Sequence, residues 1–94
     1  MSWTVYILRT RSGRLYTGIT TDLARRFAEH RGTRGAARGA RSLRGDPPRS
    51  IAYREAQSDR AAATRREAAI KRLSRAAKLA LIDGGGHGRR ARRG

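Results

Sequence analysis

Four side chains between Tyr6 and His30 are of types that could act together in one chemical step. Tyr6 and Tyr16 stand ten residues apart, and Arg26 and His30 follow them at the spacing of one helical turn. An arginine on a half-buried face needs an anionic partner, and a histidine can move a proton near neutral pH. In a chain this basic, the natural anion is a phosphate group. The four residues therefore suggest a phosphate-binding site with proton-transfer groups beside it.

The two tyrosines lie in segments that predict a β-hairpin. Residues 2–8, SWTVYIL, are rich in β-branched and aromatic side chains, which favours a strand. RSGR at 11–14 is typical of a turn, and LYTGIT at 15–20 is expected to return as a second strand. With the pairing centred near Arg11, Tyr6 and Tyr16 lie opposite each other and point to the same face.

A short helix is predicted to follow the hairpin and to end near His30, before the glycines begin. Thr20 or Thr21 is expected to cap it. Asp22 then falls in the first turn, where the helix dipole favours an anion.

The face of this helix carries both apolar and chemically active residues. Leu23 and Phe27 form the apolar stripe, and Arg26 and His30 share that stripe at helical spacing. Arg25 lies off the stripe and is expected to face solvent. Packed on the hairpin, the helix would bring Arg26 and His30 beside the two tyrosines.

The second half of the chain predicts one more strand and two more helices. Residues 31–49 are basic and rich in glycine and proline, which predicts a mobile loop rather than a packed element. SIAYREA at 50–56 is expected to form a third strand, and 58–73 a helix capped by Ser58 or Asp59. The apolar stripe of that helix comprises Ala62, Ala63, Ala69, Ile70 and Leu73.

A last helix over 75–82, capped by Ser74, completes the order ββαβαα. This order predicts an α+β fold with a small mixed sheet covered by helices. We expect residues 1–83 to form one domain and residues 84–94 to form a disordered basic tail.

Charge is the dominant feature of the composition. The 94 residues include 23 Lys+Arg against 7 Asp+Glu, which gives a net charge of +16. Such a chain attracts polyanions, and its binding to a phosphate backbone should weaken steeply with salt. Four of the six arginines of the predicted loop are expected to contact nucleic acid: Arg34, Arg38, Arg41 and Arg44.

The composition also excludes several classes of protein. With no cysteine, the chain has neither disulfides nor a thiolate metal site, so a zinc finger is excluded. The sequence contains no long apolar run, so neither a signal peptide nor a membrane span is predicted. The expected location is the cytoplasm, in association with the nucleoid in a bacterium.

Three motifs together resemble the GIY-YIG nuclease family, in particular its small stand-alone single-domain members. They are VYIL at 5–8, YTG at 16–18 and DLARRFAEH at 22–30. IAYREA at 51–56 is similar to the family's third strand, and residues 64–82 are similar to the helices that supply its metal-binding glutamate. The resemblance covers Trp3 to Ile82 and implies a three-stranded antiparallel sheet flanked by helices.

By position, the resemblance implies five catalytic residues: Tyr6, Tyr16, Arg26, His30 and Glu67. Glu67 would hold one Mg²⁺ or Mn²⁺ through a hard oxygen. Arg26 would donate its planar fork to the non-bridging phosphate oxygens. Tyr6 is the candidate general base, provided that the metal and Arg26 lower its pKa from the usual value of about 10.

The remaining implied roles are in orientation and binding. Tyr16 would orient the water or the phosphate, and His30 would contact phosphate or shuttle a proton. Gly18 would let the nucleic-acid backbone approach closely. Lys71 is expected on a solvated helix face, with phosphate contact as a second role.

The implied function is a metal-dependent endonuclease that hydrolyses DNA phosphodiester bonds and could serve DNA repair or recombination. It would act as a monomer or weak dimer, without a small-molecule cofactor. One alternative is a non-catalytic basic module that binds DNA or RNA on the same fold, and another is a small RNA-associated protein with structural tyrosines. Under these alternatives Glu67 pairs with Lys71 at i, i+4, which contributes about 0.2–0.5 kcal/mol, and His30 caps helix carbonyls.

Overall fold

A computed structural model describes residues 2–31, 43 and 45–85 of the chain. The three strands and three helices follow the predicted order ββαβαα, and the α+β fold class with a three-stranded antiparallel sheet is confirmed. The elements are β1 (Trp3–Thr10), β2 (Leu15–Thr20), α1 (Leu23–His30), β3 (Pro48–Gln57), α2 (Arg60–Lys71) and α3 (Arg75–Gly85). The mixed sheet expected from the element order alone is wrong, because β1 pairs antiparallel with both of its neighbours.

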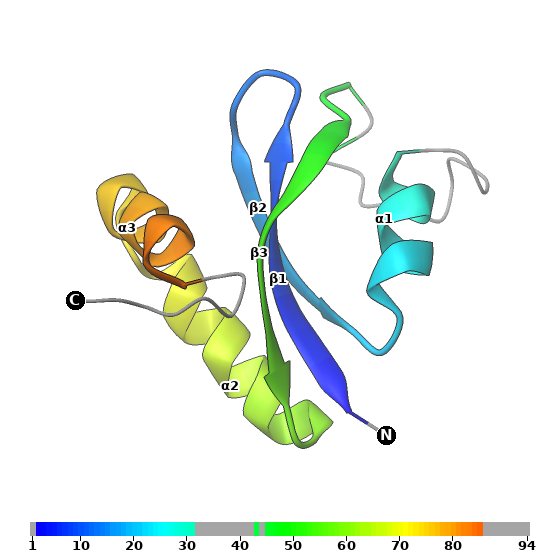
Figure 1. Cartoon of the computed structure of the whole chain (residues 1–94), viewed down its shortest axis with the longest axis vertical. Helices are drawn as coiled ribbons and strands as arrows, with labels where there is room; N and C mark the ends of the chain where they lie inside the picture. The colour runs from blue at the N-terminus through cyan, green and yellow to red at the C-terminus, as the bar shows by residue number, and fades with distance from the viewer. Residues whose placement is uncertain (1, 32–42, 44, 86–94) are drawn as a thin grey trace.

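Strand β1 lies in the centre of the sheet, between β2 and β3, and pairs antiparallel with both. Its residues Val5, Tyr6, Ile7 and Leu8 are at most 1% exposed, although they point alternately to the two faces. The unbroken apolar run of this strand is explained by burial on both sides. Figure 1 shows α1 on one side of the sheet and α2 with α3 on the other.

The register of the hairpin differs from the predicted one by two residues. Tyr6 pairs with Gly18, and Tyr16 pairs with Leu8. The hairpin is centred at Ser12 instead of Arg11, because the Thr10 N–H donates to the Arg14 carbonyl at 2.9 Å and Gly13 adopts a left-handed conformation with φ +97°. An even shift preserves the face, so the two tyrosines are diagonal neighbours on the same side of the sheet.

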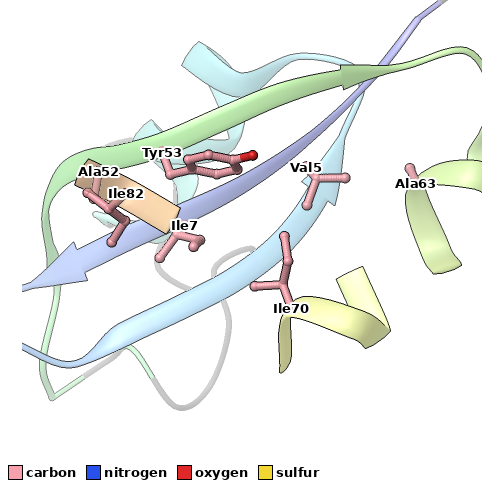
Figure 2. Packing of buried hydrophobic residues seen from close by; sticks show 7 residues of the cluster. All are labelled: Val5, Ile7, Ala52, Tyr53, Ala63, Ile70 and Ile82. Atoms are coloured by element: carbon pink, nitrogen blue, oxygen red, sulfur yellow. The ribbon is translucent and has the colours of Figure 1, made fainter. Parts of the chain in front are cut away.

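The face covered by α2 and α3 holds the larger aliphatic core, shown in Figure 2. Its buried members are Val5, Ile7, Ala52, Tyr53, Ala63, Ile70 and Ile82. Three polar side chains of this layer form a network, in which Arg66 Nε–H donates to Glu55 Oε2 at 2.9 Å and the Tyr53 hydroxyl donates to Glu55 Oε1. Val5 and Ile7 therefore anchor the two C-terminal helices to the sheet.

The face covered by α1 carries a smaller cluster. Tyr6 and Leu8 are buried there with Leu43, and the partly buried residues packed around them are Tyr16, Leu23, Phe27 and Ile51. Leu43 is fully buried, so the prediction that residues 31–49 contain no packed element is wrong at this position. The side chain of Leu43 fills a place on Tyr6 and Leu8 that would otherwise expose apolar surface. The predicted nucleic-acid contacts Arg34, Arg38, Arg41 and Arg44 lie outside the described residues.

Asp46 ties the start of β3 to the β1–β2 turn. Its carboxylate accepts hydrogen bonds from Thr10 Oγ1 at 2.8 Å, from the Ser12 backbone N–H at 2.9 Å and from Ser12 Oγ at 2.6 Å. Arg14 Nε–H donates to the same carboxylate at 3.1 Å. These donors, led by Ser12, hold the pKa of Asp46 well below its usual range. We refer to this group of contacts as the Asp46 clamp.

Strand β3 forms one edge of the sheet and is interrupted twice. It begins at Pro48, two residues earlier than predicted, and its register with β1 shifts between Ile7 and Leu8 and again between Arg9 and Thr10. Each shift places an extra β3 residue opposite the central strand, which is the geometry of a β-bulge.

Several helix details differ from the predictions. Asp22 is itself the N-cap of α1 and accepts from the Arg25 N–H at 3.1 Å, because its carboxylate reaches the free N–H groups that a first-turn residue could not. Leu73 is 37% exposed, since α2 ends at Lys71 before Leu73 can continue the stripe. Gly84 and Gly85, predicted to begin the tail, form the last residues of α3, where glycine is tolerated.

The caps of the other helices agree with the sequence. Asp59 caps α2, and Ser74 Oγ accepts from the Ala77 N–H at 3.1 Å at the start of α3. In the described part of the chain, every helix is too short or too polar to cross a lipid bilayer.

Candidate active site

A hydrogen bond between Tyr6 and His30 lies at the centre of the site. The Tyr6 hydroxyl is 3.0 Å from His30 Nε2, and the two residues are 1% and 4% exposed. The ring of Tyr16 meets the His30 imidazole edge-on, with centroids 5.2 Å apart. Two tyrosines of the hairpin contact the His30 imidazole, which explains why a histidine lies on the buried stripe of α1.

Gly18 provides the space for the Tyr6 ring. A Cβ atom at position 18 would lie 2.5 Å from Tyr6 Oη and 2.7 Å from Cζ, closer than side chains approach each other. The ring of Tyr6 therefore leans across β2 over the bare backbone of its cross-strand partner. The role predicted for Gly18 in nucleic-acid contact stays a prediction, and the structure gives the glycine this further role in positioning Tyr6.

Arg26 is held by Glu29, a residue that the sequence reasoning did not single out. Arg26 Nη1–H donates to Glu29 Oε1 at 2.9 Å, and Arg25 Nε lies 3.6 Å from Glu29 Oε2. Glu29 is 7% exposed, whereas the side chain of Arg26 is 32% exposed. One edge of the Arg26 guanidinium is therefore fixed by a buried carboxylate while part of the group reaches the surface. The sequence signal for these ion pairs was the presence of two arginines at i−4 and i−3 from a glutamate on the same helix.

The protein environment stabilises the protonated form of Tyr6. Burial and the neighbouring Tyr16 raise the pKa of the phenol to about 12, and the charge and hydrogen bonding of Arg26 act in the opposite direction. The predicted effect of Arg26 has the expected sign, but burial outweighs it. A Tyr6 phenolate at neutral pH therefore requires positive charge beyond that of Arg26.

His30 is a neutral imidazole at neutral pH. Burial lowers its pKa to about 4, the charge of Arg26 adds to this effect, and Glu29 opposes it. The ring nitrogen Nε2 of His30 lies at hydrogen-bonding distance from the Tyr6 hydroxyl. Its predicted roles in phosphate contact and proton transfer stay predictions.

Glu67 lies on α2, which packs against the opposite face of the sheet. Its side chain is 21% exposed and its Oε2 lies 3.3 Å from Lys71 Nζ, so the i, i+4 ion pair considered for it is present. The charge of Glu67 also raises the pKa of Tyr6, as the smallest of five influences. The carboxylate is therefore within electrostatic range of the tyrosine although it belongs to the other layer.

A single carboxylate suits a magnesium-type ion. Mg²⁺ keeps several of its waters and is commonly bound through one or two carboxylates together with substrate phosphates. The described residues contain no group of three or more His, Cys, Asp or Glu side chains that could enclose a metal ion. Glu67 is thus compatible with a hydrated hard cation rather than a closed protein cage.

The strands and helices that carry the site residues lie within the region that matches known proteins. Residues 2–80 match the family model described as the GIY-YIG catalytic domain. The chain is 47% identical over 81 residues to a UPF0213 protein of Desulfotalea psychrophila, covering 86% of this chain and 71% of that one. It is 42% identical over 80 residues to a UPF0213 protein of Photorhabdus laumondii, covering 85% of this chain and 73% of the relative.

A solved structure agrees with the same fold. The solution NMR structure of a UPF0213 protein from Bacillus halodurans is 35% identical and superposes with a TM-score of 0.57. The match covers 94% of this chain and 89% of the other. The similarity therefore includes β1, β2, α1 and α2, the four elements that carry the candidate site.

Proposed function

Because the chain belongs to the GIY-YIG family, we propose that it is a metal-dependent endonuclease that hydrolyses phosphodiester bonds of DNA. The family supports a nuclease-type activity and a nucleic-acid substrate. The observation that carries the proposal is the buried Tyr6–His30 hydrogen bond with Tyr16 and Arg26 beside it. A binding surface has no need of a buried tyrosine–histidine pair, whereas a site that must orient a proton-bearing group does.

Arg26 is proposed to bind the non-bridging oxygens of the scissile phosphate. Its planar guanidinium has five N–H donors, and the bond to Glu29 fixes the direction of the fork. A preorganised cation of this kind stabilises the charge that develops on the phosphate in the transition state.

Tyr6 is proposed to position the attacking water, with His30 fixing the direction of the phenol. At a pKa of about 12 the phenol keeps its proton at neutral pH. Removal of a proton from water by Tyr6 requires that pKa to fall, and added positive charge beside the site has this effect. Tyr16 borders the same space and would limit how the phosphate enters.

Glu67 is proposed to hold the divalent ion, Mg²⁺ or Mn²⁺, which would supply Lewis-acid stabilisation and lower the pKa of bound water. In this state Glu67 would exchange its ion pair with Lys71 for the metal. We further propose that the protein acts in the cytoplasm on chromosomal DNA, in repair or recombination.

A second candidate is a non-catalytic nucleic-acid-binding module, which the net charge of +16 favours. The effect of divalent metal distinguishes the nuclease from the binding module. Cleavage requires the metal, whereas electrostatic binding weakens as Mg²⁺ competes for phosphate.

The test is cleavage of end-labelled single-stranded, duplex and branched DNA, with RNA in parallel, in Mg²⁺, Mn²⁺ or EDTA. Arg26→Ala should lower the rate by about 10²–10³-fold, the usual effect of removing one preorganised donor. Arg25→Ala is the matched control, because Arg25 also pairs with Glu29 but has a 60% exposed side chain. It should cleave at nearly the wild-type rate.

A second pair of variants tests the metal ligand. Glu67→Gln should abolish metal-dependent cleavage and leave DNA binding in EDTA nearly intact. Lys71→Gln breaks the same ion pair but keeps the carboxylate, so it should retain cleavage. Tight, salt-sensitive binding by the wild type with no metal-dependent product on any substrate would instead support the binding module.

A further inference from the structure

A hollow whose described lining includes three arginines lies at the C-terminal end of α1 and takes no part in the roles assigned so far. It has a volume of about 500 Å³, and the described residues that line it are Arg11, Arg31, Pro47, Pro48 and Arg49. We refer to it as the arginine pocket. The turn that carries Arg11 and the start of β3 lie at the same end of the sheet (Figure 1).

The charge of this pocket is not neutralised by an acidic side chain in its lining. All seven acidic residues of the chain lie within the described part, and none of them lines the pocket; they are Asp22, Glu29, Asp46, Glu55, Asp59, Glu67 and Asp83. The ion pairs of the described residues involve other basic side chains. Three guanidinium groups around one hollow repel one another, and an anion placed between them would relieve that repulsion.

The walls of the pocket are held in place by hydrogen bonds between the turn and the segment that leads into β3. The Arg11 backbone N–H donates to the Pro47 carbonyl at 2.9 Å, which joins the turn to the start of β3. The Asp46 clamp fastens the same two segments through Thr10, Ser12 and Arg14. Because Arg14 is the arginine that pairs with Asp46, the charge of Arg11 is left to the pocket.

Arg31 is held in place by stacking on an aromatic ring. The Arg31 guanidinium lies over the Phe27 ring, 5.6 Å from its centroid, a cation–π contact that limits its freedom. Arg31 also directly follows His30 at the end of α1, so one residue of the pocket lining is the chain neighbour of a site residue. Guanidinium groups that are already positioned lose less conformational freedom on binding than free ones.

We propose that the arginine pocket is a second phosphate-binding site, which holds a backbone phosphate of the same nucleic-acid strand next to the one that is cleaved. This inference deepens the proposed function, because it assumes a nucleic-acid substrate. Phosphate is the anion whose geometry guanidinium forks match. A contact away from the scissile bond would fix the register of the strand over Tyr6 and Arg26 without reading bases.

The test is DNA affinity in EDTA, where cleavage does not interfere, measured by fluorescence anisotropy at several salt concentrations. The pocket variant carries Arg11→Gln, Arg31→Gln and Arg49→Gln. Its matched control carries Arg65→Gln, Arg72→Gln and Arg75→Gln, which removes the same charge from exposed positions of the α2–α3 layer. A double variant, Arg11→Gln with Arg49→Gln, leaves α1 untouched should the loss of Arg31 affect folding, and thermal unfolding checks all three proteins.

We expect the pocket variant to lose at least about tenfold more affinity than the control. Its slope of log K against log salt should also fall by about 0.7–0.9 for each phosphate that the protein no longer neutralises. Equal losses in both triple variants would show that only net charge matters and would overturn the inference. This result is independent of cleavage, so a wild type that binds through the pocket but cuts nothing would contradict the proposed function alone.

Inorganic phosphate is the second probe, because a free phosphate has the same chemistry as a backbone phosphate. Titration followed by NMR of the arginine Nε–H groups should show weak binding of inorganic phosphate to the wild-type pocket, displaced by a short oligonucleotide. The assignment to a backbone phosphate is wrong if inorganic phosphate binds in the wild-type pocket but is not displaced by the oligonucleotide, and if the oligonucleotide binds the pocket variant as tightly as the wild type.

Discussion

The two faces of strand β1 carry different kinds of buried contact. Val5 and Ile7 point to α2 and α3 and meet aliphatic side chains such as Ile70. Tyr6 points the other way, toward α1, and meets the imidazole of His30. The aliphatic contacts are non-directional and add up with the area buried, whereas the polar contact has a defined partner and geometry.

This difference indicates a division of labour within a small domain. Among the described residues, the layer of α2 and α3 holds seven of the ten buried apolar side chains, and the layer of α1 also buries the polar groups of Tyr6, His30 and Glu29. Buried polar groups of this kind rarely add to stability as apolar groups of the same size would. We therefore expect substitutions of the apolar residues on the first face to act mainly on stability and those on the second face to act on both stability and activity. Glu67, the polar side chain of α2 that is proposed to hold the metal, is the exception on the first face.

The largest effect on stability is expected for Ile70→Ala. Ile70 is fully buried, so the loss of its side chain should lower the free energy of unfolding by about 2–5 kcal/mol. The cleavage rate per folded molecule should stay unchanged. Chemical denaturation measures the first and cleavage below the melting temperature the second.

Leu73→Ala is the control for that substitution. Leu73 follows the same helix but is 37% exposed, so its truncation should change stability by no more than about 0.5 kcal/mol. A loss of cleavage in Ile70→Ala as large as that in Arg26→Ala would show that the two faces are not separable.

The next effect is a dependence of stability on pH that comes from the α1 face. His30 has a pKa of about 4 in the folded protein and about 6.5 when unfolded, so the unfolded chain takes up a proton first as the pH falls. The stabilisation is complete above pH 6.5 and is lost between about pH 6.5 and pH 4. The part due to His30 amounts to about 3 kcal/mol at most.

The comparison of wild type with His30→Gln isolates this contribution, since Tyr6, Tyr16, Arg26 and Glu29 surround the residue in both proteins. The difference between their unfolding free energies should shrink as the pH is lowered from 7 to 4. His87→Gln, at the chain's other histidine, is the matched control. A difference that is constant with pH would show that His30 titrates normally in the folded protein.

The smallest of these effects is expected for Gly18→Ala, which adds one methyl group under the Tyr6 ring. The clash should lower stability by about 1–3 kcal/mol. It should also reduce cleavage, because the Tyr6 hydroxyl would move relative to His30. Gly45→Ala is the control, since nothing lies within 4 Å of its added Cβ. Wild-type cleavage in Gly18→Ala would show that the position of the Tyr6 ring is not critical.

The elements and the shared face of the tyrosines could be predicted from local patterns. Alternation along 2–8 and 15–20 and the apolar spacing of Leu23 and Phe27 depend on neighbouring residues only. The register was wrong by two residues because it depends on the Thr10–Arg14 hydrogen bond of the turn, which no alternation pattern specifies. The face was still correct, since an even shift preserves it.

The contacts that the sequence did not predict depend on the fold. They join residues that are far apart in the chain, or they select one of several partners that a residue could have. Glu29 could have been a surface residue of α1, and only the fold shows it buried against Arg26. Leu43 and Asp46 lie near the end of a basic, glycine-rich segment, so their anchoring to β1 and to the turn depends on tertiary structure. The arginine pocket combines residues from three separate segments for the same reason.

The irregular edge strand has a consequence for how copies of this protein meet one another. A straight ten-residue strand at the margin of a sheet would offer a row of open N–H and C=O groups onto which a second chain could add a strand. In β3 the two register shifts bend that row, and Pro48 contributes no N–H to it. The protein thereby blunts one route to aggregation by edge-to-edge pairing, in addition to the mutual repulsion that its charge provides.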